Sequence, residues 1–135
     1  MLDIRVINSE SDFGSELDQS KLVDFLHEHL DRFGDDKESI SKCIDFSFEK
    51  NGGLGGFVLA AYYEGKLVGA LVMNNTGMSG YIPENILVYV AVDSTYRGQG
   101  FGGQIVKKSF EIADGDVKLH VEYDNPAKRL YERLW

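Results

Sequence analysis

The sequence is poor in cysteine, proline and positive charge, and each shortage excludes a class of protein. Its single cysteine, Cys43, cannot form a disulfide within the chain, which argues against a disulfide-bonded scaffold and favours a reducing cytoplasm. With 14 Lys and Arg against 22 Asp and Glu, the chain has no basic stripe that could displace counterions from a nucleic acid. No apolar run reaches the length of a membrane span. We therefore expect neither a nucleic-acid nor a membrane partner.

The length of 135 residues, with 43% hydrophobic content, suits one hydrophobic core, so a single domain spanning residues 1–135 is expected. Cys43 follows a helical apolar pattern and is expected to be a structural thiol rather than a nucleophile. His27 and His29 lie two positions apart on a predicted helix and face different ways, and His120 stands alone on a predicted strand. No metal site is expected.

The period of the apolar residues changes along the chain and predicts an α/β fold. The order β-α-α-β-β-β-α-β-α indicates a mixed sheet with helices on both faces. The strands are expected from Leu2 to Asn8, Gly56 to Tyr63, Lys66 to Met73, Asn85 to Val92 and Val117 to Glu122, and the helices from Leu17 to Phe33, Asp36 to Phe48, Gln99 to Ala113 and Asn125 onward.

Two of these strands carry further expectations. Glu64-Gly65 separates two β-rich runs, which is typical of a tight antiparallel hairpin. The run from Asn85 to Val92 is almost continuously apolar, as in a strand covered on both faces. We expect it in the middle of the sheet.

A glycine-rich segment follows this strand and begins the next helix. Helix N-termini present unpaired N–H groups and a partial positive charge, and glycine lets the main chain approach an anion, so a phosphate-bearing ligand is expected there. Gly98, Gly100 and Gly103 also fit the dinucleotide pattern G-x-G-x-x-G, with Glu122 as a ribose-binding acid. Against that pattern, five residues separate Val92 from Gly98 and only one strand follows. A plain β–turn–α connection is the remaining alternative.

Two motifs stand out in the C-terminal half of the sequence, Val92-x-x-x-x-Arg97-Gly98-x-Gly100-x-Gly102 and Asn125-x-Ala127-x-x-x-Tyr131. The first resembles the Arg/Gln-x-x-Gly-x-Gly/Ala signature of the GCN5-related N-acetyltransferase superfamily, and the second resembles another block of that family. The resemblance implies a mixed, mostly antiparallel central sheet flanked by helices on both faces. It also implies acetyl-CoA as cosubstrate and a primary amine, either a small molecule or a peptide, as acceptor.

The resemblance also assigns residues to the coenzyme. The pantetheine arm is expected along the strand, the pyrophosphate in the loop with Arg97 supporting it, and the adenosine phosphates near the last helix. The expected contacts are Val90, Ala91 and Val92 for the arm, Gly98, Gln99, Gly100, Phe101 and Gly102 for the pyrophosphate, Asn125 for the arm and Lys128 or Arg129 for the adenosine end.

For catalysis, the resemblance implies direct attack of the amine on the thioester. Tyr131 is expected to protonate the leaving thiolate, and Glu84 to accept the proton of the amine; Tyr81, Glu122, His120 or a water chain are alternative bases. Family members usually continue past the Tyr131 region into one or two more strands. A shortened chain, a sheet completed by another subunit in a homodimer, and an open acceptor side are all consistent with this sequence. A coenzyme-binding regulatory domain without turnover is the alternative function.

Overall fold

The computed structural model describes residues 2–14, 17–30, 36–49, 55–75, 85–113 and 117–119. Within these ranges the order of elements agrees with the order expected from the sequence. The elements are β1 (Leu2–Ile7), η1 (Glu10–Phe13), α1 (Gln19–Leu30), α2 (Lys37–Ser47), β2 (Gly56–Tyr63), β3 (Lys66–Asn75), β4 (Asn85–Val92), η3 (Ser94–Tyr96), α3 (Phe101–Ile112) and β5 (Val117–Leu119).

The described strands form one sheet in the order β1-β2-β3-β4-β5. The first four pair antiparallel with their neighbours, and β5 pairs parallel with β4. The predicted mixed, mostly antiparallel fold is therefore confirmed. The expectation that 85–92 is the middle strand is wrong for the described sheet, because β3 holds that place. A continuously apolar strand indicates that both faces of the sheet are covered by helices, and it does not indicate where in the strand order that strand lies.

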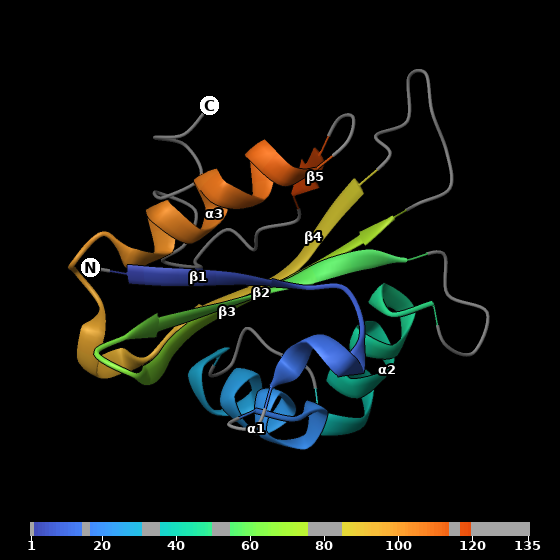
Figure 1. Ribbon diagram of the computed structural model, residues 1–135, viewed down its shortest axis with the longest axis horizontal. Helices are drawn as coiled ribbons and strands as arrows, with labels where there is room; N and C mark the ends of the chain where they lie inside the picture. The colour runs from blue at the N-terminus through green and yellow to red at the C-terminus, as the bar shows by residue number, and fades with distance from the viewer. Residues whose placement is uncertain are drawn as a thin grey trace.

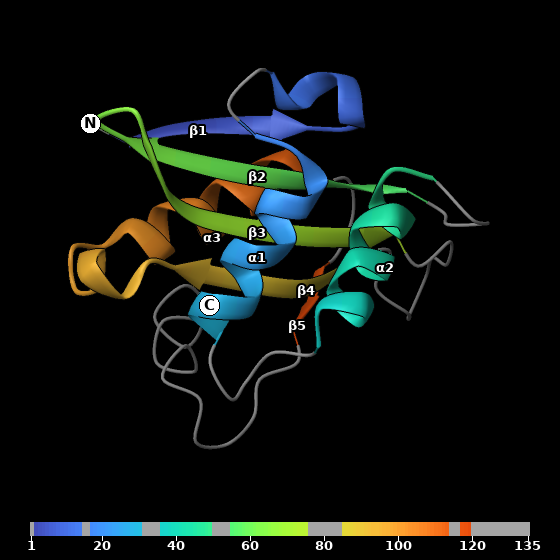
Figure 2. The same ribbon diagram turned by 90° about the horizontal axis from the view of Figure 1, so that it is seen from below.

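Helices cover both faces of the sheet. Figure 1 shows α3 on one face and α1 with α2 on the other, and Figure 2 shows α1 and α2 lying across the strands. Side chains of β2 point alternately to the two faces of the sheet. Val58 and Ala60 are fully buried on the α1/α2 face, whereas Leu59 is fully buried on the α3 face. Among the described helices, none combines the length and apolarity that a membrane crossing requires.

Helix α2 begins where the sequence predicts it. The Asp36 carboxylate accepts the N–H of Ser39 at 2.8 Å, and this bond, as the main cause, lowers the pKa of Asp36. Cys43 is half-buried, and its Sγ donates to the Tyr89 hydroxyl at 3.8 Å. These contacts agree with the structural role expected for this thiol.

The β2–β3 hairpin also follows the sequence. Glu64 and Gly65 have φ of 52° and 79°, as a two-residue type I′ turn requires. Between β1 and α1, the residues Glu10–Phe13 form the short helix η1. Phe13 of this short helix is buried and packs edge-on against Phe48, with ring centroids 5.6 Å apart. A single buried aromatic therefore fixes a segment that carries no helical period.

Two β-bulges reverse the faces of the strands. The β2–β3 pairing skips Val68, and the β3–β4 pairing skips Val88. Side chains alternate along a strand, so Leu87 and Tyr89 would share a face without the second bulge. Instead, Leu87 packs on the α3 face and Tyr89 on the α1/α2 face. This shift decides which main-chain groups of β4 face away from β3.

We predict that Gly69 sets the approach of α3 to the sheet. A Cβ at Gly69 would lie 2.4 Å from Cδ1 of Ile105, so Gly69→Ala should destabilise the fold by about 1 kcal/mol. Ile105→Val removes that methyl and alone should cost about 1 kcal/mol. Urea unfolding of both single variants and of the double variant gives the coupling free energy between positions 69 and 105. The double variant should be more stable than the sum of the two changes predicts; simple additivity would contradict this packing account.

Candidate functional site

Within the described residues, one edge of β4 is paired over only part of its length. The β5 pairing reaches only Asn85, Ile86 and Leu87. From Val88 to the end of β4, no strand within the described residues lies on this edge. Within the described part of the chain, this leaves a gap beside β4 from Val88 onward, and β4 presents main-chain groups in that gap.

The hydrogen-bond pattern identifies these groups. The N–H of Asp93 donates to the carbonyl of Val68 at 2.8 Å, so the main chain of Asp93 faces β3. Main-chain groups alternate sides along a strand, so Ala91 faces β3 as well, and Val90 and Val92 face the open edge. Of the three residues expected along the pantetheine arm, two thus direct main-chain groups into the gap. Contact with the arm itself stays a prediction.

The segment from Asp93 to Gly100, which we call the phosphate loop, joins β4 to α3. The Asp93 carboxylate accepts the N–H of Thr95 at 2.9 Å and caps η3. Gly98 and Gly100 have φ of 86° and 81°, a conformation that a side chain disfavours. Among the described residues, a Cβ at either glycine would meet nothing within 4 Å. The loop therefore uses glycine for its main-chain path, and the space in front of both residues is open.

The N-terminus of α3 carries unpaired N–H groups. The first helical hydrogen bond joins Gln104 N to Gly100 O at 3.2 Å, so the amides of Phe101, Gly102 and Gly103 have no acceptor within the helix. The capping position, Gly100, supplies no side-chain cap, and the first turn holds no acidic residue. These amides and the helix dipole form a site suited to an anion.

Arg97 fastens the phosphate loop to two other elements. Its Nε donates to the carbonyl of Val92 at 3.2 Å, and its Nη2 donates to the carbonyl of His29, in the last turn of α1, at 2.7 Å. The guanidinium is thus bonded to main-chain carbonyls. The sequence suggested that Arg97 supports a pyrophosphate, and that contact stays a prediction.

An aromatic cluster holds the loop from the hairpin side. The rings of Tyr63 and Phe101 lie 5.2 Å apart, and Tyr96 stacks on Phe101 at 6.2 Å. Lys66, next to the hairpin turn, lies over the Tyr96 ring at 5.3 Å from its centroid. In Figure 1 the loop lies beside the turn of β2 and β3. The cluster joins the start of α3 to the β2–β3 hairpin.

Asp93 is a buried carboxylate at the base of the loop. It is 8% exposed, and its Oδ2 lies 3.8 Å from Nε2 of His29 and 3.7 Å from Nζ of Lys66. The N–H of Thr95 is the main cause that lowers the pKa of Asp93, and His29 and Lys66 act in the same direction. A charged Asp93 therefore stabilises the loop.

Several of the expected site residues lie outside the described residues. They are Tyr131, Glu84, Asn125 and Lys128, together with the alternatives Arg129, Tyr81, Glu122 and His120. In contrast, His29 was not assigned to the site from the sequence. Its contacts are with Ser94, Arg97 and Asp93, more than 60 positions away along the chain. No local motif could have identified it.

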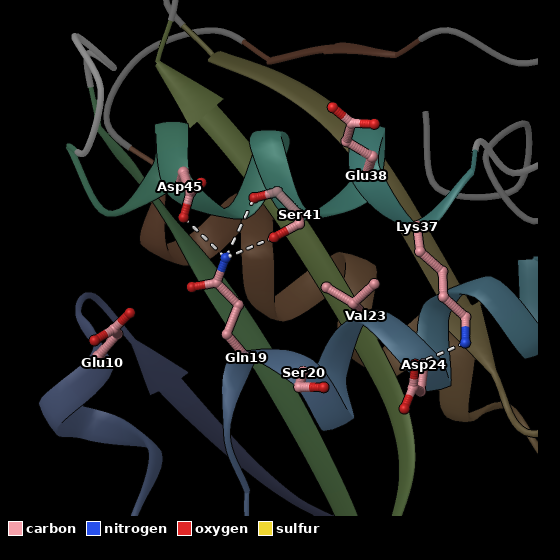
Figure 3. A pocket seen from close by; sticks show the side chains of 9 residues that line it. All are labelled: Glu10, Gln19, Ser20, Val23, Asp24, Lys37, Glu38, Ser41 and Asp45. Carbon is pink, nitrogen blue, oxygen red and sulfur yellow. Dashed lines mark hydrogen bonds and ion pairs between the residues drawn. The ribbon is translucent and has the colours of Figure 1, made fainter.

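A separate hollow of about 590 Å³ lies between α1 and α2 (Figure 3). Glu10, Glu38 and Asp45 line it, and Lys37 pairs there with Asp24 at 3.0 Å. Gln19 crosses it and donates to Ser41 and Asp45, which ties the two helices together. No residue of the phosphate loop lines this hollow, so its acidic wall is not the anion site.

Solved structures share the fold of this chain. The chain superimposes on a candidate acetyltransferase from Pyrococcus horikoshii (TM-score 0.64, 17% identity), covering 98% of the chain but only 42% of the other protein. It also matches an aminoglycoside acetyltransferase from an uncultured soil sample, with a TM-score of 0.66 and 19% identity, covering 100% of this chain and 91% of the other. A third match is a chain of the NatC complex bound to Gag peptide and CoA. Its TM-score is 0.70 and its identity 17%, and the match covers 98% of this chain and 82% of the other.

The family is established by the sequence itself. Residues 15–134 match the profile of the acetyltransferase (GNAT) family, so the chain belongs to that family. The resemblance drawn from the two motifs is thereby confirmed. No curated protein matches the chain significantly.

We predict that the Asp93 charge stabilises the fold in a pH-dependent way. Asp93→Asn keeps an acceptor for Thr95 but loses the charge facing His29 and Lys66, and should cost on the order of 1 kcal/mol at pH 7. Because the folded pKa of Asp93 lies below its ordinary 3.8, its stabilisation is present above that value and is lost as the pH falls through the folded pKa. Urea unfolding measures the free energy of unfolding of both proteins at pH 7 and pH 3. The difference between variant and wild type should be smaller at pH 3 than at pH 7. An equal difference at both pH values would contradict a stabilising charge on Asp93.

Proposed function

We propose that residues 1–135 act as one acetyl-CoA-dependent N-acetyltransferase domain. The observation that carries the proposal is the uncapped N-terminus of α3 beside the open edge of β4. The first suits a pyrophosphate, and the second suits an extended chain with amide groups. An acyl coenzyme A combines both features in one molecule.

The proposed coenzyme contacts follow this geometry. Main-chain N–H groups from Gly98 to Gly102 would hold the pyrophosphate. The outward-facing groups of Val90 and the N–H of Val92 would pair with the amides of the pantetheine arm, since the Val92 carbonyl accepts from Arg97. Asn125 and Lys128 complete the proposal at the arm and at the adenosine phosphates. The open space at Gly98 and Gly100 is consistent with a ligand that approaches the main chain closely.

The bound thioester supplies the acetyl group, and the chain's own residues move the protons. In our proposal Glu84 accepts a proton from the ammonium form of the acceptor, so that a neutral nitrogen reaches the carbonyl carbon. A main-chain N–H of β4 near Val92 polarises the carbonyl oxygen. The new C–N bond forms, the C–S bond breaks, and the Tyr131 phenol gives its proton to the thiolate. The excess proton of the amide nitrogen passes through water to the Tyr131 phenolate and restores the phenol, and Glu84 releases its proton to solvent.

We propose a cationic amine as the acceptor. The formal charge of −8 favours cations near the protein. Related folds include an aminoglycoside acetyltransferase and a complex bound to a peptide, so both a small amine and a peptide amine are consistent with the fold. A reducing cytoplasm, suggested by the free Cys43, and a homodimer are further parts of this proposal.

A coenzyme-binding regulatory domain is the second candidate. It requires the same phosphate loop but no proton donor at Tyr131. The two functions therefore predict the same affinity for coenzyme and differ only in turnover.

A charge at the start of α3 tests the pyrophosphate site. In Gly102→Asp, the new carboxylate would compete with the pyrophosphate for the free amides and repel it, so CoA affinity should fall at least about tenfold. Folding stability should be kept or increased, because acidic residues suit the first turn of a helix. Calorimetric titration with CoA and urea unfolding measure the two effects.

The matched control is Gln104→Glu, which adds the same charge on an exposed position of α3. It should change CoA affinity by less than about threefold, since the first-turn effect falls off beyond that turn. NAD should not bind to the wild type. Unchanged affinity in Gly102→Asp, or equal losses in both variants, would rule out the proposed pyrophosphate site.

Removing the Tyr131 hydroxyl distinguishes an active acetyltransferase from a regulatory domain without turnover. Tyr131→Phe should lower kcat by about tenfold to a hundredfold and leave the Kd for acetyl-CoA within about twofold. Mass spectrometry of a panel of amines incubated with acetyl-CoA identifies the acceptor for this assay. If wild type binds acetyl-CoA but acetylates no amine of the panel, the regulatory domain becomes the better account.

A further inference from the structure

The last turn of α1 lies against the phosphate loop. Helix C-termini leave carbonyls unpaired, and cations stabilise them. The last turn of α1 contains His27 and His29 but no Lys or Arg. Arg97, on the loop, supplies the missing donor: its Nη2 lies 2.7 Å from the carbonyl of His29. Helix α1 and the loop therefore complete each other's hydrogen bonds.

The His29 side chain makes a second connection to the same loop. Its Nδ1 accepts the N–H of Ser94 at 3.4 Å. This bond requires the proton on Nε2, which faces carboxylate oxygens of Glu28 at 3.5 Å and Asp93 at 3.8 Å. The side chain is only 10% exposed, and the Phe25 ring packs on it with centroids 4.6 Å apart. The imidazole thus has little room to turn away.

These two contacts fix both ends of η3. Ser94 is its first residue, and Arg97 follows its last residue, Tyr96. The main chain then passes directly through Gly98 and Gly100 to the free amides of α3. A glycine-containing path has little stiffness of its own. Its direction consequently depends on where η3 is held.

We propose that His29 is a positioning residue for the coenzyme pyrophosphate. It does not touch the ligand; it holds Ser94 through its imidazole and Arg97 through its carbonyl, so that the amides at the start of α3 converge on one anion. The inference rests on the proposed function, because it assumes that the loop binds CoA. It makes α1 a part of the coenzyme site.

Three substitutions separate the hydrogen bond from the bulk of the ring. His29→Asn keeps an oxygen near the position of Nδ1, His29→Gln moves the polar group toward the position of Nε2, and His29→Leu removes both. His27→Leu, on the exposed side of the same helix, is the matched control. CoA affinity is measured by calorimetry and folding stability by urea unfolding for each variant.

The Leu and Gln variants should bind CoA about three- to tenfold more weakly than wild type, the range expected for one hydrogen bond. The Asn variant and the His27 control should remain within about twofold. If the Leu variant does not fold, the comparison of Asn with Gln still decides the question. Rescue by Asn is the result that a purely structural role for the ring would not give.

Two failures can be told apart. A wild type that does not bind CoA contradicts the proposed function and, with it, this inference. A wild type that binds CoA, together with Gln and Leu variants of unchanged affinity, overturns the inference alone. Equal weakening in the Asn and Gln variants also overturns it, because the acceptor at Nδ1 would then not be the cause.

Discussion

The unpaired amides at the start of α3 are the feature around which the rest of the structure is arranged. A helix N-terminus without a cap leaves hydrogen-bonding capacity unused and lowers the stability of the helix. Here the surrounding elements keep that end open and fixed. Arg97 bonds it to β4 and α1, and the Tyr63–Tyr96–Phe101 cluster packs it against the hairpin. Rigid support around open donors is what a preformed anion site requires.

The open edge of β4 has the same character. An unpaired strand edge is a liability that folds usually cover. Within the described residues, the pairing of β4 with β5 ends at Leu87, so the outward-facing main-chain groups of β4 adjoin the amides of the phosphate loop at the end of β4. The core on both faces of the sheet supports this arrangement, with Leu71 and Val72 fully buried on opposite sides. The buried core on both faces of the sheet therefore stabilises the fold enough to allow unpaired main-chain groups at the site.

Local patterns predicted the elements well and the tertiary contacts poorly. The strand 85–92, the Glu64-Gly65 turn and the Asp36 cap follow from residue type and spacing, because their partners lie within a few positions. The bulge at Val88 depends on pairing with β3, and an apolar run gives no sign of it. The middle place of β3 depends likewise on which strands pair at the edges. The role of His29 required contacts across 65 positions, so only the folded chain could reveal it.

In the proposed function, the amides at the start of α3 bind the coenzyme pyrophosphate. Amide NMR spectra of the chain, recorded while CoA is added, can detect this contact residue by residue. The account predicts that the N–H signals from Gly98 to Gly103 shift most and exchange more slowly with solvent in the complex, with smaller changes at Val90 and Val92. Signals of residues lining the hollow between α1 and α2, such as Gln19 and Ser41, should stay in place. Shifts centred on that hollow, or none in the loop at saturating CoA, would contradict the account.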